Sequence, residues 1–111
     1  MSDVPHSEPR ISVIIVNYNV RDLLESCLHS VESALDAVPG EILVVDNASD
    51  DGSADMVRQK FPDVVLIESD SNLGFARANN LALARARGAY LLLLNPDTLV
   101  QEDTLQTMLS F

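Results

Sequence analysis

Four short apolar runs, separated by segments of helical periodicity, constrain the fold of this chain more than any other feature. The predicted strands are Ile11–Val16, Glu41–Val45, Val64–Ile67 and Ala89–Leu94. Because Ile11–Val16 is β-branched and almost continuously apolar, it is predicted to be a strand that is buried on both faces. The segments between the four runs carry apolar residues at helical spacing, so strands and helices alternate. This alternation predicts an α/β fold, with a mainly parallel sheet and right-handed crossovers in three α/β/α layers.

Capping and breaking residues predict where the helices begin and end. We expect Asn19 to cap the first helix, with Asp22 in its first turn, and Ser53 to cap the second. Glycine and proline close the helices by removing a side chain or a backbone donor. The first predicted helix ends at Pro39-Gly40 and the second at Pro62. The third runs from Phe75 to Arg87, with Phe75, Ala78 and Ala82 on its apolar face, and the last runs from Gln101 to Phe111.

Length and charge limit the classes of function. The chain has 111 residues, which predicts one domain, 11–111, after a flexible leader, 1–10. The net charge of −10 argues against sequence-independent binding to nucleic acid, which needs basic patches. The single cysteine, Cys27, is typical of a reducing cytoplasm. No apolar run reaches the roughly 20 residues of a membrane span. We therefore expect a cytoplasmic protein, including the inner face of the membrane as a location.

Polar residues follow two of the predicted strands directly. Asp46 begins an acidic and amide-rich run that extends to Ser53, and Asn95-Pro96-Asp97 follows the last strand. Open α/β sheets bind ligands at the carboxyl ends of their strands, so both segments are candidate sites. Helix capping would explain the serines of the first run but not Asp46. A dinucleotide site is disfavoured because no glycine-rich turn follows the first strand, and no P-loop motif is present.

The Asn95–Asp97 turn has two interpretations that its spacing alone does not separate. It is either an Asx-type turn that starts a helix or the place where Asp97 binds a divalent metal. A third polar segment runs from Asn72 to Asn80. There Gly74 would permit close approach of a ligand to the backbone, and Arg77 is suited to phosphate. The alternative is that Asn72 caps the helix and Arg77 is solvated.

Motifs of other enzyme classes are absent. The chain has no GxSxG, CxxC or HExxH motif, and His6 and His29 are isolated, so hydrolase and zinc-site interpretations lack support. A receiver-type signalling domain would need an acidic pair after the first strand, where Asn17-Tyr18 stands. A non-catalytic interaction module with the same fold remains an alternative.

Four ordered segments resemble family 2 glycosyltransferases, which have the GT-A fold with a Rossmann-like nucleotide-binding half. The similarity runs from Ile11 to the end of the chain and is greatest to the rhamnosyltransferase-like branch. The matching segments are Ile11–Asn19, Val44–Ser53, Asn72–Asn80 and Leu94–Asp97.

The resemblance implies a role for each segment. Asp46 would contact the base of a nucleotide-diphosphate sugar, and Asp97 would be the last carboxylate of the DxD motif that binds Mg²⁺ or Mn²⁺. The metal would stabilise the leaving nucleotide diphosphate. The remaining candidate contacts to the nucleotide sugar are Asn17, Tyr18, Asn47, Asp50, Asn72, Gly74, Arg77, Asn80 and Asn95.

Two departures from the family pattern qualify what the resemblance implies. Asn95 occupies the first position of DxD, which leaves Asp97 as the strong ligand of that motif. Family members also continue well beyond this length, into an acceptor-binding half that carries the catalytic base. We therefore expect a truncated, donor-binding part of an inverting transferase. It would bind a UDP- or dTDP-sugar, act with a saccharide or lipid-linked acceptor in the full-length protein, and self-associate as a homodimer through exposed apolar surface.

Overall fold

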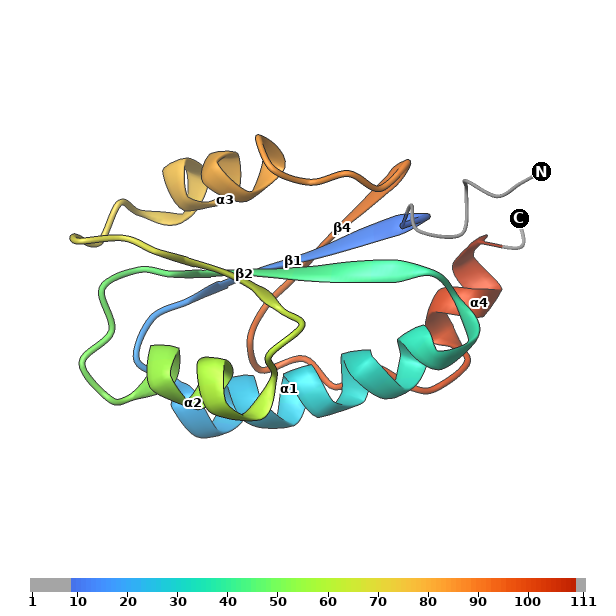
Figure 1. Ribbon diagram of the computed structural model, residues 1–111, viewed down its shortest axis with the longest axis horizontal. Helices are drawn as coiled ribbons and strands as arrows, with labels where there is room; N and C mark the ends of the chain where they lie inside the picture. Colours follow the sequence, from blue (N-terminus) through green and yellow to red (C-terminus); the bar gives the residue numbers. More distant parts are fainter. Residues whose placement is uncertain (1–8, 110–111) are drawn as a thin grey trace.

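A four-stranded parallel sheet forms the middle of the computed structural model, which describes residues 9–109 (Figure 1). Its spatial order is β3-β2-β1-β4. This order and the parallel pairing confirm the predicted sheet. The strands are β1 (Ile11–Asn17), β2 (Gly40–Asp46), β3 (Val65–Glu68) and β4 (Tyr90–Leu94).

Helices cover both faces of the sheet and confirm the predicted three layers. Figure 1 shows α1 and α2 on one face and α3 on the other, with α4 beside the far end of α1. A 3₁₀ turn continues α1 toward β2. The helices are α1 (Arg21–Ala34), α2 (Ser53–Lys60), α3 (Phe75–Leu83) and α4 (Thr104–Leu109), and the 3₁₀ turn covers Leu35–Ala37.

Alternate residues of β1 point into two separate hydrophobic clusters. Val13 and Ile15 belong to the larger cluster, beneath α1 and α2. Ile14 belongs to the smaller one, where Ala78 and Ala82 of α3 pack. All three β1 residues are fully buried, so the prediction of a strand buried on both faces is confirmed for β1.

Strand β4, in contrast, is not buried on both faces. Leu91 and Leu93 are 50% and 45% exposed, because α3 packs over β1 and β2 and leaves this side of β4 uncovered. The helix is also shorter than predicted and ends at Leu83. Its first residue, Phe75, is 61% exposed rather than part of the apolar face, and Asn79 is buried in the helix instead.

Arg10, the last residue of the predicted leader, contacts the sheet and α4. Its backbone N–H donates to Pro39 O at 2.8 Å, and its carbonyl accepts from Tyr90 N at 3.0 Å. The Arg10 guanidinium also donates to Leu109 O and lies 5.9 Å from the centre of the Tyr90 ring. Residues 1–8 of the predicted leader and the predicted helical residues 110–111 lie outside the described part of the chain.

The largely covered carboxylate of Glu41 joins the amino-terminal ends of β1 and β2 to the segment that leads into β4. Glu41 Oε2 accepts hydrogen bonds from Ser12 Oγ and from the Arg87 backbone N–H, both at 2.7 Å. Ser12 Oγ in turn accepts from Gly88 N at 2.8 Å. A Cβ on Gly88 would lie 2.6 Å from Ser12 N, so Gly88 permits a close approach of two backbones rather than simply ending a helix.

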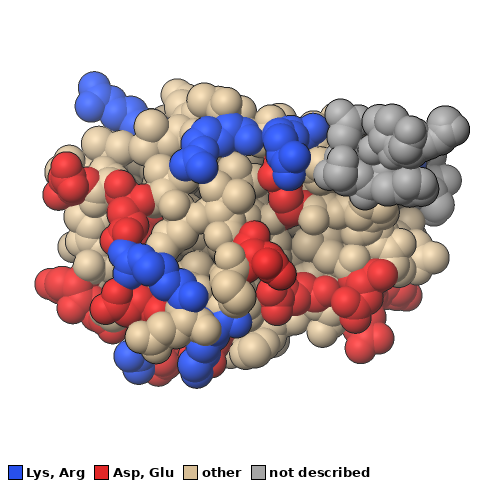
Figure 2. Space-filling view, in the orientation of Figure 1, with Lys and Arg blue, Asp and Glu red and all other residues tan. Residues whose placement is uncertain are grey.

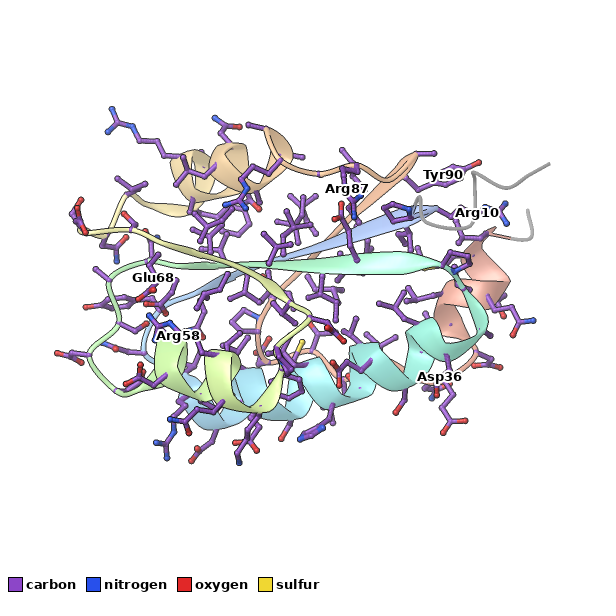
Figure 3. The ribbon with its side chains drawn as sticks, viewed as in Figure 1. Arg10, Asp36, Arg58, Glu68, Arg87 and Tyr90 are labelled. Atoms are coloured by element: carbon purple, nitrogen blue, oxygen red, sulfur yellow. The ribbon has the colours of Figure 1, made fainter. Side chains whose placement is uncertain are left out.

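The ionisation of Glu41 reflects these contacts. Burial raises the pKa of the carboxyl, but the hydrogen bonds from Ser12 and the Arg87 backbone, with the charge of the Arg87 guanidinium, outweigh it. The pKa of Glu41 therefore lies below its usual range. Figure 3 shows Arg87 beside β1 and β2 in this region, away from the Arg58–Glu68 pair that joins α2 to β3 at the other end of the sheet.

Candidate functional site

The predicted site segments meet at the carboxyl-terminal edge of the sheet. Asp46 is the last residue of β2 and pairs in register with Asn17, the last residue of β1. On the other side of β1, Leu94 pairs with Ile15, and Asp97 follows three residues later. Since neighbouring strands lie about 4.8 Å apart, the ends of β2 and β4 are about 10 Å from one another. This spacing suits an extended ligand that lies across β1.

Asn17 and Asp46 form the buried centre of this edge. Asn17 Nδ2 donates to Asp46 Oδ1 at 3.0 Å and to Ser49 Oγ at 3.3 Å, and Asp46 Oδ2 accepts from Ser49 N at 3.0 Å. Asn17 is completely buried and Asp46 is 4% exposed. Within the described residues, Asn17 Oδ1 is a buried oxygen without a hydrogen-bond partner. The two side chains therefore fix each other's orientation.

Asn19 connects the loops that follow β1 and β2, instead of capping α1. Its φ of 52° is left-handed, its backbone N–H donates to Ser49 Oγ at 2.9 Å, and its Oδ1 accepts from Asp50 N at 2.8 Å. Val20 occupies the cap position of α1 and makes no side-chain cap hydrogen bond. The prediction that Asn19 caps this helix is therefore wrong, although Asp22 does lie in the first turn.

Asp51 supplies the capping interaction for two helices. Its Oδ2 accepts from Arg21 N at the start of α1, and its Oδ1 accepts from Ser53 N at the start of α2, both at 3.0 Å. Ser53 is the first residue of α2 and donates its hydroxyl to Asp51, so the prediction that Ser53 is the cap is wrong. Burial raises the pKa of Asp51, but hydrogen bonds from Ser53 and Arg21 outweigh it and hold that pKa below its usual range.

Asn47 holds the segment Asn72–Gly74 against the end of β2. Asn47 is 3% exposed; its Oδ1 accepts from Leu73 N at 2.9 Å, and its Nδ2 lies 3.5 Å from Gly74 O. Asn72 Oδ1 accepts from Gly74 N at 2.9 Å, so Asn72 forms an Asx-type turn. Gly74 has a φ of 81° with open space around its α-carbon, which leaves the backbone accessible to a ligand.

The other predicted contacts are exposed. Tyr18 is 50% exposed directly after β1, and Asp50 is exposed on the loop after β2. Arg77 and Asn80 are exposed on α3, whereas Ala78 and Asn79 are buried, so Arg77 and Asn80 point away from the sheet. The structure thus gathers Asn17, Tyr18, Asp46 and Asp50 at the sheet edge and places Arg77 and Asn80 on the outer side of α3.

The segment from Asn95 to Val100 carries Asp97 and lies against α1. Asn95 O accepts from Thr98 N at 3.0 Å, which closes a turn around the exposed Asp97. Cys27 Sγ lies 3.9 Å from the same carbonyl, and Ser30 Oγ accepts from Val100 N at 3.0 Å. Burial and the charge of Asp97 raise the pKa of Cys27 to about 11. Sequence patterns gave no sign of these contacts from α1.

The residues at this edge fit a metal that takes most of its ligands from the substrate. Among the described residues, no three His, Cys, Asp or Glu side chains are grouped to hold an ion. Asp46 already accepts hydrogen bonds from Asn17 and Ser49, whereas the exposed Asp97 side chain accepts none from residues 9–109. Mg²⁺ commonly uses one or two carboxylates and completes its shell with phosphate and water. Asp97 can supply such a carboxylate.

The surface around the site is mixed in charge. Figure 2 shows basic side chains along the α3 side of this face. Acidic side chains, with some basic ones among them, lie along the α1–α2 side.

No helix in residues 9–109 has both the length and the apolar character needed to cross a membrane.

Two relatives of the chain are named as glycosyltransferases. TuaG of Bacillus subtilis (strain 168), provisionally named a teichuronic acid biosynthesis glycosyltransferase, is 37% identical over 109 residues, which cover 94% of this chain and 42% of TuaG. A poly(ribitol-phosphate) beta-glucosyltransferase of Bacillus spizizenii is 35% identical over 92% of this chain and 17% of its own length. The chain thus spans less than half the length of these relatives.

Solved structures share the fold. The mannosyltransferase PcManGT of Pyrobaculum calidifontis, in complex with GDP-Man and Mn²⁺, superimposes with a TM-score of 0.78 and 34% identity, over 88% of this chain and 30% of PcManGT. S. aureus TarS 1–349 in complex with UDP gives a TM-score of 0.82 over 91% of this chain and 31% of TarS 1–349; its 24% identity shows a common fold alone. The parallel sheet and flanking helices are those of the GT-A fold.

The sequence profile named "Glycosyl transferase family 2" matches residues 12–111. This match covers β2, β3 and β4, all of β1 except Ile11, and every segment of the sheet edge described above. The chain therefore belongs to glycosyl transferase family 2.

Proposed function

We propose that this chain is the donor-binding part of a glycosyltransferase that transfers a sugar from a nucleotide-diphosphate sugar to a saccharide or lipid-linked acceptor. The observation that carries the proposal is the placement of Asp46, at the end of β2, and of Asp97, in the turn after β4, at one edge of the sheet on either side of β1. The spacing of about 10 Å between these strands lets one ligand contact both ends. Family membership and a relative that binds GDP-Man and Mn²⁺ support a nucleotide-sugar ligand.

Asp46 is suited to the base of the nucleotide. Its orientation is fixed by Asn17 and Ser49, and a carboxylate that accepts from a ring N–H or amino group would select among bases. Tyr18, which is half exposed beside it, offers a ring for stacking against the base. Asp50 and the backbone near Asn72 and Gly74 would line the ribose and the diphosphate.

Asp97 is suited to the metal-bound diphosphate, with Asn95 beside it. Mg²⁺ or Mn²⁺ bound there would neutralise the charge that develops on the leaving nucleotide diphosphate. In the proposal, the role of Asp97 is to hold the ion at the β4 side of the edge while Asp46 holds the base at the β2 side. Arg77 and Asn80 would reach the donor only if the sugar extends over the amino-terminal end of α3.

The finer identity of the reaction is also part of the proposal. We propose that the reaction inverts the configuration at the anomeric carbon. The proposed donor is a dTDP- or UDP-sugar, and dTDP-rhamnose is the first to test. The proposed location is the cytoplasm or the inner face of the membrane. We further propose that the carboxylate that activates the acceptor lies outside these residues, so the chain alone transfers no sugar. The exposed side of β4, with Leu91 and Leu93, supports self-association, which light scattering would detect; a strictly monomeric sample would refute it.

Calorimetric titration tests the donor site directly. We expect the folded chain to bind UDP or dTDP weakly in the presence of Mn²⁺ or Mg²⁺. Asp97→Asn should remove most of the dependence of affinity on the metal, and Asp46→Asn should weaken binding with and without the metal. Asp36→Asn is the matched control, because Asp36 is exposed at the opposite end of the molecule, where Figure 3 labels it. No heat with any of UDP, dTDP or GDP in a folded sample would refute the site.

A further inference from the structure

The segment that carries Asp97 is anchored to α1 at both of its ends. Ser30 Oγ accepts from Val100 N at 3.0 Å and donates to Cys27 O at 2.7 Å, so one hydroxyl joins the segment to the helix backbone. Cys27 Sγ lies 3.9 Å from Asn95 O, at the start of the same segment. Asp97 stands between the two anchors.

The anchors matter because the position of the Asp97 side chain depends on its backbone, which the anchors hold together with the packing of Leu94 and Val100 against the core. Its side chain is exposed and, among the described residues, makes no hydrogen bond or ion pair. Its position therefore depends on the backbone from Asn95 to Val100, where the turn hydrogen bond from Thr98 N to Asn95 O is the local constraint. The side chains of such a loop are well ordered only where contacts with the rest of the protein hold the loop in place.

Helix α1 is a firm support for these anchors. Cys27 and its core neighbours Leu24, Leu28 and Val31 are completely buried. The first turn of α1 is held by Asp51, from the loop that follows β2. One rigid helix thus contacts both the loop on the Asp46 side of the edge and the turn on the Asp97 side.

We propose that Ser30, assisted by Cys27, is a positioning residue that holds Asp97 where a nucleotide-bound metal can reach it. This inference rests on the proposed function. A carboxylate that binds a metal must lie within a few tenths of an ångström of the position that the coordination geometry requires. Octahedral Mg²⁺ tolerates little deviation from that geometry. Losing the hydroxyl of Ser30 frees Val100 N and lets the turn move, while the base-side network of Asn17 and Asp46 stays intact.

Two measurements on the 111-residue chain test this role. Amide hydrogen exchange followed by NMR reports whether Val100 N–H is protected, and titration with UDP in the presence and absence of Mn²⁺ separates the metal-dependent part of the affinity. The variants are Ser30→Ala, Ser30→Thr, which restores a hydroxyl, and Ser33→Ala, a control on the exposed face of α1. Cys27→Ala tests the weaker anchor.

In Ser30→Ala we expect faster exchange at Val100 and about fivefold weaker UDP binding with Mn²⁺, the loss equivalent to one net hydrogen bond. UDP binding without metal should be unchanged, Ser30→Thr should recover most of the loss, and Ser33→Ala should behave as wild type. Cys27→Ala should act in the same direction with a smaller effect.

Unchanged exchange at Val100 in Ser30→Ala would overturn the anchor itself. Equal weakening of UDP binding with and without Mn²⁺ would overturn its role in positioning Asp97. If the wild-type chain binds no UDP with Mn²⁺, the proposed function fails together with the role of Ser30 in metal binding, and that result is distinct from a failure of the anchor.

Discussion

Glu41→Gln should destabilise the domain because Glu41 connects β1 and β2 to the segment that leads into β4, at the edge opposite the site. The Glu41 side chain is 9% exposed, and its Oε2 accepts from Ser12 Oγ and from Arg87 N, both at 2.7 Å. Glutamine has the same shape, so its oxygen can accept both hydrogen bonds. The substitution therefore isolates the contribution of the charge.

The magnitude follows from these contacts. Each hydrogen bond changes from one with a charged acceptor to a neutral one, a loss of about 1 kcal/mol per bond. The contact with the Arg87 guanidinium, at 3.4 Å, adds little because Arg87 is 65% exposed and solvent screens the pair. The expected loss at neutral pH is about 2 kcal/mol, or roughly 8 °C in melting temperature for a domain of this size.

The loss should depend on pH in a defined direction. Since the pKa of Glu41 is lower in the folded than in the unfolded chain, its charge stabilises the fold above the unfolded-state pKa. That contribution disappears as the pH falls through the folded-state pKa. The wild type and Glu41→Gln should therefore differ most near pH 7, and the difference should shrink below the ordinary carboxyl range of about pH 4.

Urea denaturation followed by circular dichroism at several pH values measures this difference. Glu32→Gln is the control, because Glu32 is exposed on α1 and is hydrogen-bonded to no described side chain. A Glu41→Gln variant as stable as wild type at pH 7, or a difference that grows as the pH falls, would refute the reasoning.

Two further substitutions test how the backbone is held. Gly88→Ala should cost about 3 kcal/mol or prevent folding, since its Cβ would lie 2.6 Å from Ser12 N. Gly74→Ala has open space around its Cβ, but its φ of 81° and ψ of 169° suit glycine alone, so it should cost about 1–3 kcal/mol. A melting temperature equal to that of the wild type for either variant would contradict this. Asp51→Ala should cost about 2 kcal/mol, because one carboxylate caps α1 and α2. Circular dichroism melts would check the Asp51 prediction, and a loss below about 0.5 kcal/mol would show that water replaces these caps.

The sequence predicted the architecture well because hydrophobic periodicity is a local signal. All four strands lie close to the predicted ranges, and the parallel pairing follows from their alternation with helices. Composition alone does not show that one face of β4 is exposed, because that exposure depends on how far α3 extends. Leu91 and Leu93 have the composition of a buried strand but lie beside a helix that covers only β1 and β2.

Sequence patterns could not predict the contacts between segments that are distant along the chain. Asn19 and Ser53 have the residue types and positions of caps, but the acceptor for both helices is Asp51. Asn47 resembles a ligand contact, yet its amide bonds to the backbone of Leu73 and Gly74. Ser30 had no motif to mark it, because its partner Val100 lies 70 residues away. Side chains that hold a site are thus found only once the fold brings these segments together.

The central claim is that one nucleotide-diphosphate ligand occupies the carboxyl-terminal edge of the sheet, from the end of β2 to the turn after β4. Titration of the ¹⁵N-labelled chain with UDP and diamagnetic Mg²⁺, followed by amide chemical shifts, tests it most directly. We predict that the shifts change at Asn17–Asn19, Asp46–Asp51 and Asn95–Thr98, with the last segment responding only when Mg²⁺ is present. Changes confined to the hollow at the opposite edge, lined by Glu32, Asp36 and Glu41, or none at all, would contradict the claim.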